Sequence, residues 1–418
     1  MSGENHRPRV VITGLGLVTC LGSKVNSVWD ALLNGRSGIR AITQFDASDL
    51  PCKIAGEVPE FDPTDYLPLK EARRMSRSSQ FALAAARQAM QDAGFDEDWR
   101  EPERVGVYYG TAIGGWDRAY EGLESLRLKG LSKTNPFFLP SVLPNMAAFH
   151  VTQQYHALGP NSTVTTACAT GTQAIGEAGQ AIRNGWADVV ICGGTEAIIK
   201  HFTIAGFSIM RALPTSFNET PEQASRPFEI QREGFVFSEG AACLIIESLD
   251  HAKARGAPIY AEIAGFASSS DAFHMAAPDP SGAGAVRTMK RALDNAGVAP
   301  DQVSYINAHG TSTPANDTME TLAIKTVFGT RAYQIPVSST KSMLGHAMGA
   351  SGAIEAIVCA LSIQNGAIHP TINYEVPDPE LDLDYVPNES RDAKVEVVLS
   401  NSFGLGGQNA CLVIRRLV

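Results

Sequence analysis

The chain has 418 residues, of which 44% are hydrophobic and 19% are charged, and its formal net charge is −10. This composition is ordinary for a globular protein, and the length allows a large buried core in roughly one to three folding units. The negative charge argues against the broad basic surface that nucleic acids need, and no apolar run reaches the ~20 residues of a membrane helix. We therefore expect neither nucleic acid nor a membrane as a partner.

Short apolar segments alternate along the chain with helices rich in alanine and glycine, beginning with a predicted strand at residues 10–14. This alternation is typical of an α/β fold with buried sheets. The 38 glycines fit such a fold, because glycine lets backbones approach one another closely.

A basic segment precedes a helix predicted at residues 81–93. It carries Lys70, Arg73, Arg74 and Arg77 in close succession. A solvated helix end is the simpler interpretation of such a cluster, and a docking surface for an acidic partner is the other. Charge alone does not choose between them.

Residues 163–172 are the most informative segment of the chain, because a run rich in threonine and valine ends there at Cys168 and a helix of small residues follows. A cysteine at a strand-to-helix turn lies near backbone N–H groups without partners, at the positive end of the helix dipole. Such a position favours the thiolate, which is the nucleophilic form. A small buried core cysteine is the alternative interpretation.

Two histidines of the second half also follow predicted strands. His309 comes after the apolar residues 303–306, and His346 lies between residues 335–337 and a helix predicted at 350–363. A single histidine is usually structural, whereas one cysteine and two histidines in matching strand-end loops indicate nucleophilic chemistry. A zinc site built from the same side chains is an alternative, but no closely spaced pair of ligands anchors it.

The two halves of the chain repeat one order of elements: a strand, a loop with a candidate residue, a helix that ends at Asn-Gly, and a later strand that leads into a glycine loop. Self-similarity of this kind predicts two copies of one structural unit. We expect residues 1–257 to form an N-terminal half that carries Cys168 and cap insertions. Residues 258–418 would form a C-terminal half that carries His309 and His346, and the two copies would bring these three side chains together.

The chain contains seven cysteines, most of them in apolar segments. An odd number of cysteines in buried-looking strands indicates reduced thiols. We therefore expect a cytoplasmic protein.

These segments and several others resemble the elongating β-ketoacyl-acyl-carrier-protein synthases. The matching motifs extend over nearly the whole chain, and their ordered set is far more specific than any one of them. They are VITGLG at residues 11–16, TACATG at 166–171, RPF at 226–228, REGF at 232–235, SSDAFHM at 269–275, HGTST at 309–313, KSMLGH at 341–346 and NSFG at 401–404.

The resemblance implies a thiolase-like α/β fold, in which two similar halves form a five-layered α-β-α-β-α arrangement, usually as a homodimer. It implies an acyltransferase that moves an acyl group from acyl carrier protein to its cysteine. That acyl group then condenses with malonyl-acyl carrier protein, with loss of carbon dioxide, to give 3-oxoacyl-acyl carrier protein in fatty acid chain elongation. This chemistry requires no metal and no organic cofactor. A structural cation near Glu355 and Asn401 is left open.

The resemblance also implies roles for residues of this chain that match the family motifs. The catalytic residues would be Cys168, as the nucleophile, with His309, His346 and Lys341, and the backbone N–H groups of Cys168 and Leu405 would form the oxyanion hole. Glu355 and Phe403 would support the site, and Thr311 and Thr313 would bind the phosphopantetheine arm. Acyl carrier protein would dock on Lys70, Arg73 and Arg74. Asp317 and Glu320 are interpreted as charges at a helix start.

One position departs from the family pattern. The family's glycine loop usually reads Gly-Phe-Gly-Gly, with a phenylalanine that gates the acyl pocket, whereas this chain has Leu405. A backbone donor survives a change of side chain, so we expect catalysis to persist and the pocket entrance to differ. The alternatives are a ketosynthase of a polyketide or specialised lipid pathway, a thiolase or chalcone-synthase-like enzyme, and a non-catalytic chain-length partner, against which Cys168 argues.

Overall fold

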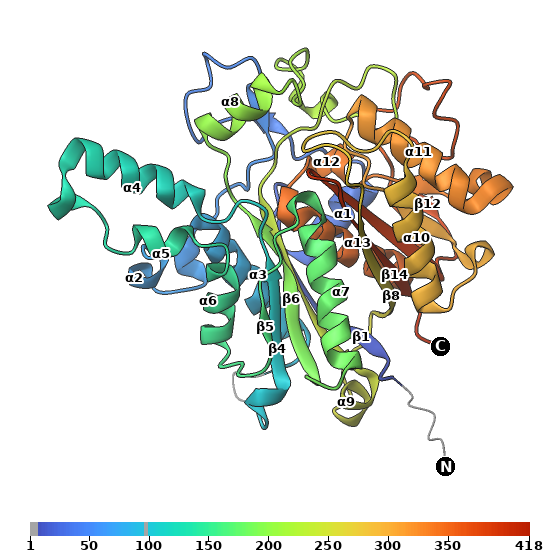
Figure 1. The fold of residues 1–418 in the computed structure, drawn as a ribbon, viewed down its shortest axis with the longest axis horizontal. Coiled ribbons are helices and arrows are strands. Elements are labelled where there is room, and N and C mark those ends of the chain that lie inside the picture. The colour runs from blue at the N-terminus through green and yellow to red at the C-terminus, as the bar shows by residue number, and fades with distance from the viewer. Residues whose placement is uncertain (1–6, 96–98) are drawn as a thin grey trace.

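The computed structural model describes residues 7–95 and 99–418, and ten strands within these ranges form one mixed sheet in the order β10-β9-β13-β14-β8-β1-β7-β6-β4-β5 (Figure 1). The first half of the chain contributes β1 (Val10–Val18), β4 (Val105–Gly110), β5 (Asn161–Ser162), β6 (Val189–Glu196) and β7 (Gly240–Ser248). The second half contributes β8 (Ala261–Ser270), β9 (Tyr305–Asn307), β10 (Val337–Ser338), β13 (Val397–Gly404) and β14 (Gln408–Arg415).

The two halves of this sheet have the same topology. In the first half β4 runs parallel to β5 and β6, while β7 is antiparallel to β6 and β1. In the second half β9 runs parallel to β10 and β13, while β14 is antiparallel to β13 and β8. Antiparallel pairing of β1 with β8 joins the two half-sheets. The predicted repetition of one α/β unit is therefore confirmed.

The helices add three layers to the two half-sheets. Helices α3 (Arg77–Asp92) and α6 (Met146–Gln154) cover the outer face of the first half-sheet, and α10 (Ala283–Ala296) and α11 (Pro314–Phe328) cover that of the second. Between the half-sheets lie α7 (Thr170–Arg183) and α13 (Ser351–Asn365), which pack on strands of both and on each other. This is the predicted five-layered arrangement, and the prediction is confirmed.

Small residues make the contact between the two central helices. A Cβ atom on Gly171 would lie 2.6 Å from the backbone nitrogen of Ala353. A Cβ on Gly352 would in turn lie 2.7 Å from the backbone nitrogen of Thr172. Neither position tolerates a side chain at this spacing, so the small residues of the sequence let the starts of α7 and α13 meet.

The remaining elements surround this framework. The helices are α1 (Val25–Leu33), α2 (Leu69–Ala72), α4 (Trp116–Lys129), α5 (Phe138–Val142), α8 (His201–Ile209), α9 (Leu249–Ala254) and α12 (Lys341–Leu344), and the short strands are β2 (Arg40–Ala41), β3 (Ile54–Ala55), β11 (Ala367–Ile368) and β12 (Arg391–Asp392). Helices α4 and α5 project from the side of the first half, and α8 lies above it (Figure 1). None of the helices in the described ranges is long and apolar enough to cross a membrane.

Element boundaries differ from the predictions in a few places. The threonine- and valine-rich run before Cys168 forms no strand after the short β5 (Asn161–Ser162). The helix expected at 81–93 starts earlier, after Ser76, whose hydroxyl caps the N–H of Ser79. Residues 1–6 of the predicted N-terminal half lie outside the described residues. The predicted boundary between residues 257 and 258 falls in the loop between α9 and β8, and the division into domains there stays a prediction.

Candidate active site

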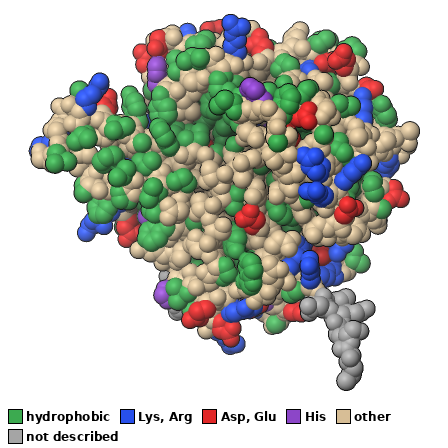
Figure 2. Space-filling view, viewed as in Figure 1, with side chains coloured by type: hydrophobic (Ala, Val, Ile, Leu, Met, Phe, Trp, Pro, Cys, Tyr) green, Lys and Arg blue, Asp and Glu red, His purple; other side chains and the backbone are tan. Residues whose placement is uncertain are grey.

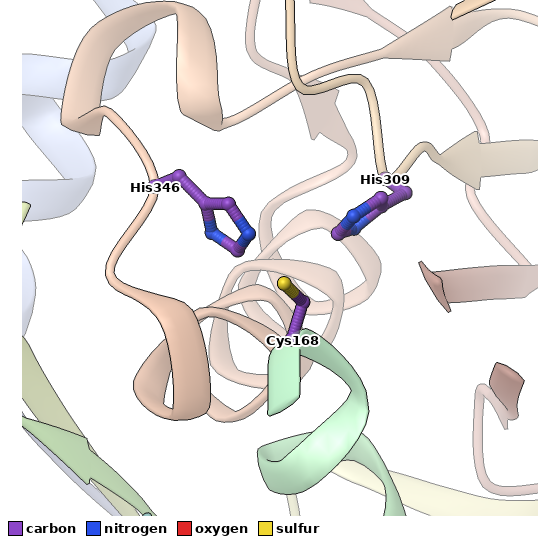
Figure 3. A group of neighbouring side chains, drawn as sticks. All are labelled: Cys168, His309 and His346. Atoms are coloured by element: carbon purple, nitrogen blue, oxygen red, sulfur yellow. The ribbon is translucent and has the colours of Figure 1, made fainter. Parts of the chain in front are cut away.

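Cys168 lies in a single 3-10 turn, η4 (Ala167–Ala169), that leads directly into α7. The first residue of this turn, Ala167, has a φ of +49°, a left-handed conformation that costs energy for a residue with a side chain. The turn directs the buried Cys168 side chain toward two histidines (Figure 3).

His309 and His346 approach Cys168 from the other half of the molecule. His309 follows β9, and His346 lies between α12 and the 3-10 turn η8 (Met348–Ala350) that precedes α13. The Cys168 sulfur and the nearest ring nitrogens all lie within 4.8 Å of one another. The two rings are nearly perpendicular, with centroids 5.4 Å apart. The structure thus brings together the three side chains that the sequence singled out.

The position of His346 is fixed by its backbone and by a serine. Its N–H donates to the carbonyl of Val236 at 2.7 Å, and its carbonyl accepts from the N–H of Ser238 at 3.0 Å. The ring atom Nδ1 lies 2.9 Å from Ser351 Oγ, at the start of α13. Nε2 has no hydrogen-bond partner in the described part of the chain. This nitrogen is therefore available to a substrate.

A buried glutamate holds the loop that carries His309. Glu320 accepts the N–H of His309 at 2.9 Å and the N–H of Gly310 at 2.8 Å. The ring of Phe403 packs edge-on against His309, with centroids 5.7 Å apart. Both contacts restrict the position of His309, and the second places Phe403 where it can support the imidazole ring.

Both imidazoles are neutral in this site. Burial holds the pKa of His309 and of His346 well below the usual value, and the nearby charge of Lys341 lowers each pKa further. A neutral imidazole carries one N–H donor and one acceptor nitrogen, so each ring can donate one hydrogen bond without bearing a charge.

The thiol of Cys168 differs from the sequence-based expectation. Burial raises its pKa to about 11, although the backbone N–H groups of Leu405 and of Cys168 itself and the charge of Lys341 lower it. Burial therefore opposes the thiolate that the helix start was expected to favour, because the loss of hydration outweighs the N–H donors and the charge of Lys341. Both N–H groups nevertheless act on the sulfur, as donors of an oxyanion hole would.

Lys341 and Glu355 form a buried ion pair behind the histidines, between Lys341 Nζ and Glu355 Oε1. Burial raises the pKa of Glu355 to about 7, against the opposing effect of Lys341. The buried oxygens Glu355 Oε2 and Asn401 Oδ1, near which the sequence left a cation open, have no partner among the described residues, but the Lys341 ammonium already pairs with Glu355 and opposes a further cation there. If a cation were bound, it would add positive charge next to Glu355.

A cavity of about 410 Å³ leads from the surface to the three side chains. Thr311 and Thr313 line it, and their hydroxyl oxygens lie 2.9 Å apart. Leu405 lines the same cavity next to Cys168. The two threonines thus line the same cavity as the Cys168 sulfur.

Comparison with known proteins agrees with this arrangement. The family of the β-ketoacyl synthase N-terminal domain matches residues 7–252, and that of the β-ketoacyl synthase C-terminal domain matches residues 260–375. The chain belongs to the β-ketoacyl synthase family.

Individual members of the family are similar over nearly their whole length. The chain is 50% identical over 412 residues to the 3-oxoacyl-[acyl-carrier-protein] synthase 2 of Coxiella burnetii, covering 99% of both proteins. It is 49% identical to the protein of the same name from Synechocystis, covering 98% of this chain and 99% of that protein.

Solved structures of ketosynthases share the fold. A β-ketoacyl synthase from Burkholderia phymatum matches with a TM-score of 0.91 and 37% identity, over 98% of this chain and 100% of that one. A type II PKS ketosynthase, solved in complex with its acyl-carrier protein, matches with a TM-score of 0.90 and 37% identity, over 99% of this chain and 100% of that one.

The basic segment of this β-ketoacyl synthase divides into two parts. Lys70, Arg73 and Arg74 are exposed and line a surface hollow together with Phe137, over whose ring the Arg74 guanidinium lies at 4.7 Å. Arg77 instead pairs at 2.9 Å with Glu239, whose side chain is buried. Arg77 therefore belongs to the interior, and the first three form the accessible part of the patch.

The cluster of Cys168, His309 and His346 also has the composition of a three-ligand zinc site. The positive charge of Lys341 acts on all three groups, since it lowers the pKa of each. A neighbouring ammonium opposes the binding of a dication. The electrostatics of the cluster therefore favour anionic chemistry at the sulfur over metal binding.

Several buried polar residues that hold the site were not identified from the sequence. Glu320 is one of them, and its interpretation as a helix-start charge is wrong, because it lies beyond the first turn of α11 and binds the backbone of His309. Asp317 does lie in the first turn, where it accepts the N–H of Phe228 at 2.9 Å. Glu196 has no motif that would reveal it, since its partner Gly349 is 153 positions away and is bound through its backbone. Ser351 lies only five residues from His346, and none of the motifs includes it.

Proposed function

We propose that this protein catalyses the decarboxylative condensation of an acyl group on Cys168 with malonyl-acyl carrier protein, giving 3-oxoacyl-acyl carrier protein in fatty acid chain elongation. The observation that carries this proposal is the meeting of Cys168, His309 and His346 at the inner end of one cavity. The relatives of about half-identical sequence are named as synthases of this product class. Roles for individual residues follow from the geometry.

The first step would transfer the acyl group to the enzyme. The sulfur of Cys168 attacks the thioester carbon of acyl-acyl carrier protein, and the carrier's thiol leaves. Because the pKa of Cys168 is raised to about 11, the thiol must lose its proton as it attacks. A neutral imidazole within 4.8 Å of the sulfur can accept that proton and return it to the departing thiolate, which balances the step.

The second step would generate the carbon nucleophile. Malonyl-acyl carrier protein binds with its thioester carbonyl toward His309 and His346, and its carboxylate leaves as carbon dioxide. The electron pair of the broken C–C bond becomes an enolate, which hydrogen bonds from both imidazoles stabilise. Donation from the Ser351 hydroxyl to His346 Nδ1 would leave the ring proton on Nε2, the nitrogen without a partner.

The third step would join the two carbon chains. The enolate carbon attacks the Cys168 thioester, and the backbone N–H groups of Cys168 and Leu405 receive the oxyanion. Loss of one such donor typically costs about 3–4 kcal/mol of barrier. The tetrahedral intermediate then expels the Cys168 thiolate, which takes up a proton. Lys341, held by Glu355, would stabilise this anion through its charge.

Acyl carrier protein is the partner that these steps require. Carrier proteins are acidic and present their acyl group on a phosphopantetheine arm. We propose that Lys70, Arg73 and Arg74 dock the carrier and that Thr311 and Thr313 bind the arm. Among the described residues no acidic side chain pairs with the three basic ones, and both threonines line the cavity that leads to Cys168.

We also propose a homodimer that covers the side of α4, α5 and α6. Apolar side chains gather on that side of the molecule (Figure 2). Those more than half exposed are Trp116, Leu123, Leu128, Leu131 and Leu139. The edge strand β5 lies on the same half. Exposed apolar surface of this density marks an interface, and light scattering coupled to gel filtration would measure the mass of the assembly.

Two further proposals concern the setting of the reaction. The seven cysteines are all free and buried, which is typical of a reducing compartment, so we place the protein in the cytoplasm. We also propose that the condensation requires no metal and no organic cofactor. Prolonged treatment with a chelator, followed by metal analysis and assay, should leave the rate unchanged.

The experiment that tests the main proposal uses purified protein with acyl- and malonyl-acyl carrier protein. Cys168→Ala should abolish condensation and the acyl adduct that mass spectrometry detects, while decarboxylation of malonyl-acyl carrier protein persists. Condensation by Cys168→Ala at the wild-type rate would refute the nucleophile assignment. Absence of any acyl adduct on the wild-type protein would favour a non-catalytic chain-length partner.

A polyketide or specialised lipid ketosynthase is the second candidate. Leu405 at the cavity favours it, as do the 37% identical ketosynthase structures. The higher identity to the 3-oxoacyl-[acyl-carrier-protein] synthases favours the first candidate. Carrier proteins bearing saturated chains of varied length, compared with carriers bearing polyketide intermediates, would separate the two.

A further inference from the structure

A buried carboxylate that the proposed mechanism does not use joins three segments of the site. Glu196 is the last residue of β6 and is completely buried. Its Oε1 accepts the Thr111 hydroxyl at 3.0 Å and the N–H of Ile113 at 3.3 Å. Its Oε2 accepts the N–H of Ala112 at 2.8 Å and the N–H of Gly349 at 3.2 Å.

These bonds cross between the two halves of the molecule. Residues 111–113 follow β4 in the first half, whereas Gly349 belongs to the turn η8 of the second half. The turn η8 begins two residues after His346 and packs against the turn η4 that contains Cys168. A Cβ on Gly194, two residues before Glu196, would lie 2.3 Å from the carbonyl of Gly349. The end of β6 is therefore in tight contact with η8.

We propose that Glu196 is a positioning residue of the condensing site: by binding the backbone of Gly349 and of residues 111–113, it holds η8 against η4 and so keeps His346 aligned with Cys168. This inference rests on the proposed function, because it concerns the same site. Ser351, whose hydroxyl contacts His346 Nδ1, lies two residues beyond Gly349, so a shift of η8 would move this hydroxyl as well.

Glu196 also acts on the sulfur through its charge. The charged and titratable groups around Cys168 are Glu196 and Lys341, which respectively raise and lower the pKa of the thiol, together with His309 and His346. Burial raises the pKa of Glu196 to about 7. The carboxylate is therefore ionised at the higher pH at which Cys168 loses its proton, and its removal lowers the pKa of Cys168.

Glu196→Gln tests the proposal because the side chain keeps its size while one acceptor oxygen becomes an NH₂ group that faces N–H donors. We expect the condensation kcat to fall by about tenfold to a hundredfold, as misalignment of reacting groups does, with an unchanged KM for the carrier substrates. The rate of alkylation of Cys168 by iodoacetamide, measured as a function of pH, should begin to rise at a lower pH than in the wild type. A role in stability alone would not move this profile.

Glu247→Gln is the matched control. Glu247 is equally buried, on β7, and accepts from Thr13, His251 and Arg255. Its substitution should lower the unfolding temperature and leave both kcat per folded enzyme and the alkylation profile as in the wild type. The proposal fails if Glu196→Gln keeps the wild-type kcat and profile, or if Glu247→Gln lowers kcat to the same extent.

A second variant keeps the proposal testable should Glu196→Gln fail to fold. Thr111→Val removes one donor to Glu196 and leaves the carboxylate in place, and we expect a smaller fall in kcat with unchanged KM. A wild-type kcat in Thr111→Val would then overturn the proposal. Failure of the wild-type protein to condense its substrates would refute the proposed function instead, while the alkylation profile, which needs no substrate, still tests Glu196.

Discussion

The starts of the two central helices are built alike and differ in what their backbone N–H groups face. Each helix begins after a 3-10 turn, η4 or η8, with a residue of positive φ in it, +49° at Ala167 and +43° at Met348. Each turn meets the end of a strand from the opposite half, since β13 ends against η4 and β6 ends against η8.

The strand end decides the difference. At the end of β6 stands Glu196, whose carboxylate accepts the N–H of Gly349 in η8. At the end of β13 stands Gly404, which has no side chain and lies against Cys168 in η4. The N–H groups of Cys168 and Leu405 thus face the sulfur and the cavity. One helix start binds an internal anion, and the other leaves its N–H groups for the anion that forms in the proposed reaction.

The comparison predicts the largest effect for Gly404→Ala. A Cβ there would lie 2.7 Å from the carbonyl of Thr166 and 3.3 Å from the N–H nitrogen of Cys168, so the oxyanion hole must deform. We expect kcat per folded enzyme to fall by about 10²-fold or more, together with a lower unfolding temperature, because the contact with a backbone carbonyl forces the backbone to shift. Gly206→Ala is the control, because its Cβ would meet nothing within 4 Å. Equal activity of both variants would break the comparison.

The start of α7, where no carboxylate of the described residues accepts the N–H groups beside Cys168, also leads to a prediction of how Cys168 responds to pH. With its pKa raised to about 11 by burial, the thiol is almost fully protonated at pH 7. The rate of alkylation by iodoacetamide should still rise between pH 8 and pH 10, in the range where a free cysteine approaches its plateau. Mass spectrometry of the modified protein measures this rate. A plateau below pH 8 would show a thiolate in the resting enzyme.

Gly349→Ala should lower both stability and kcat, because the added Cβ pushes η8 away from the residues that hold it. Its Cβ would lie 2.6 Å from the backbone nitrogen of Ala112 and 3.1 Å from Glu196 Oε2. Overpacking of this kind typically costs about 1–3 kcal/mol, so we expect a lower midpoint in urea unfolding. The loss of kcat should be smaller than that of Gly404→Ala. A larger loss of kcat in Gly349→Ala than in Gly404→Ala would contradict the idea that the start of α7, and not that of α13, faces the reaction.

Sequence patterns were sufficient to predict the framework and the meeting of Cys168, His309 and His346. Repetition of strand, loop and helix predicts two copies of one unit, and two such copies facing each other bring Cys168 to the histidines. Small residues such as Gly171 and Gly352 are visible in the sequence and allow this close approach. These features depend on local order and residue size, which a sequence displays directly.

The remaining parts of the site depend on contacts between distant segments. Glu196 binds Gly349 from 153 positions away, and Arg77 pairs with Glu239 across 162 positions, so no local pattern reveals either bond. The raised pKa of Cys168 was not foreseen for a similar reason, since a helix start is visible in the sequence and the depth of burial is not. Glu320 was interpreted as a helix-start charge because its burial and its bond to the His309 backbone come from tertiary packing.

Ser351→Ala, at the start of α13, should have a smaller effect on the rate than the glycine variants. The variant removes the hydroxyl that contacts His346 Nδ1 and leaves the start of α13 otherwise intact. Loss of one hydrogen bond of about 1 kcal/mol corresponds to roughly a fivefold slower decarboxylation. Ser351→Thr, which keeps the hydroxyl, should restore the rate. Equal rates in Ser351→Ala and the wild type would show that the backbone hydrogen bonds of His346 with Val236 and Ser238 are enough to orient it.

The smallest effect on rate is expected for a change of the Leu405 side chain, and this change should act selectively on acyl chain length. Leu405 contributes its N–H to the sulfur and its side chain to the cavity wall. Leu405→Phe keeps the N–H and enlarges the side chain, so the maximal rate should change by less than about threefold while the preferred acyl chain length shifts. Assays with acyl-acyl carrier proteins of graded length measure both quantities. Identical chain-length profiles would show that the backbone of this residue, and not its side chain, is what the site uses.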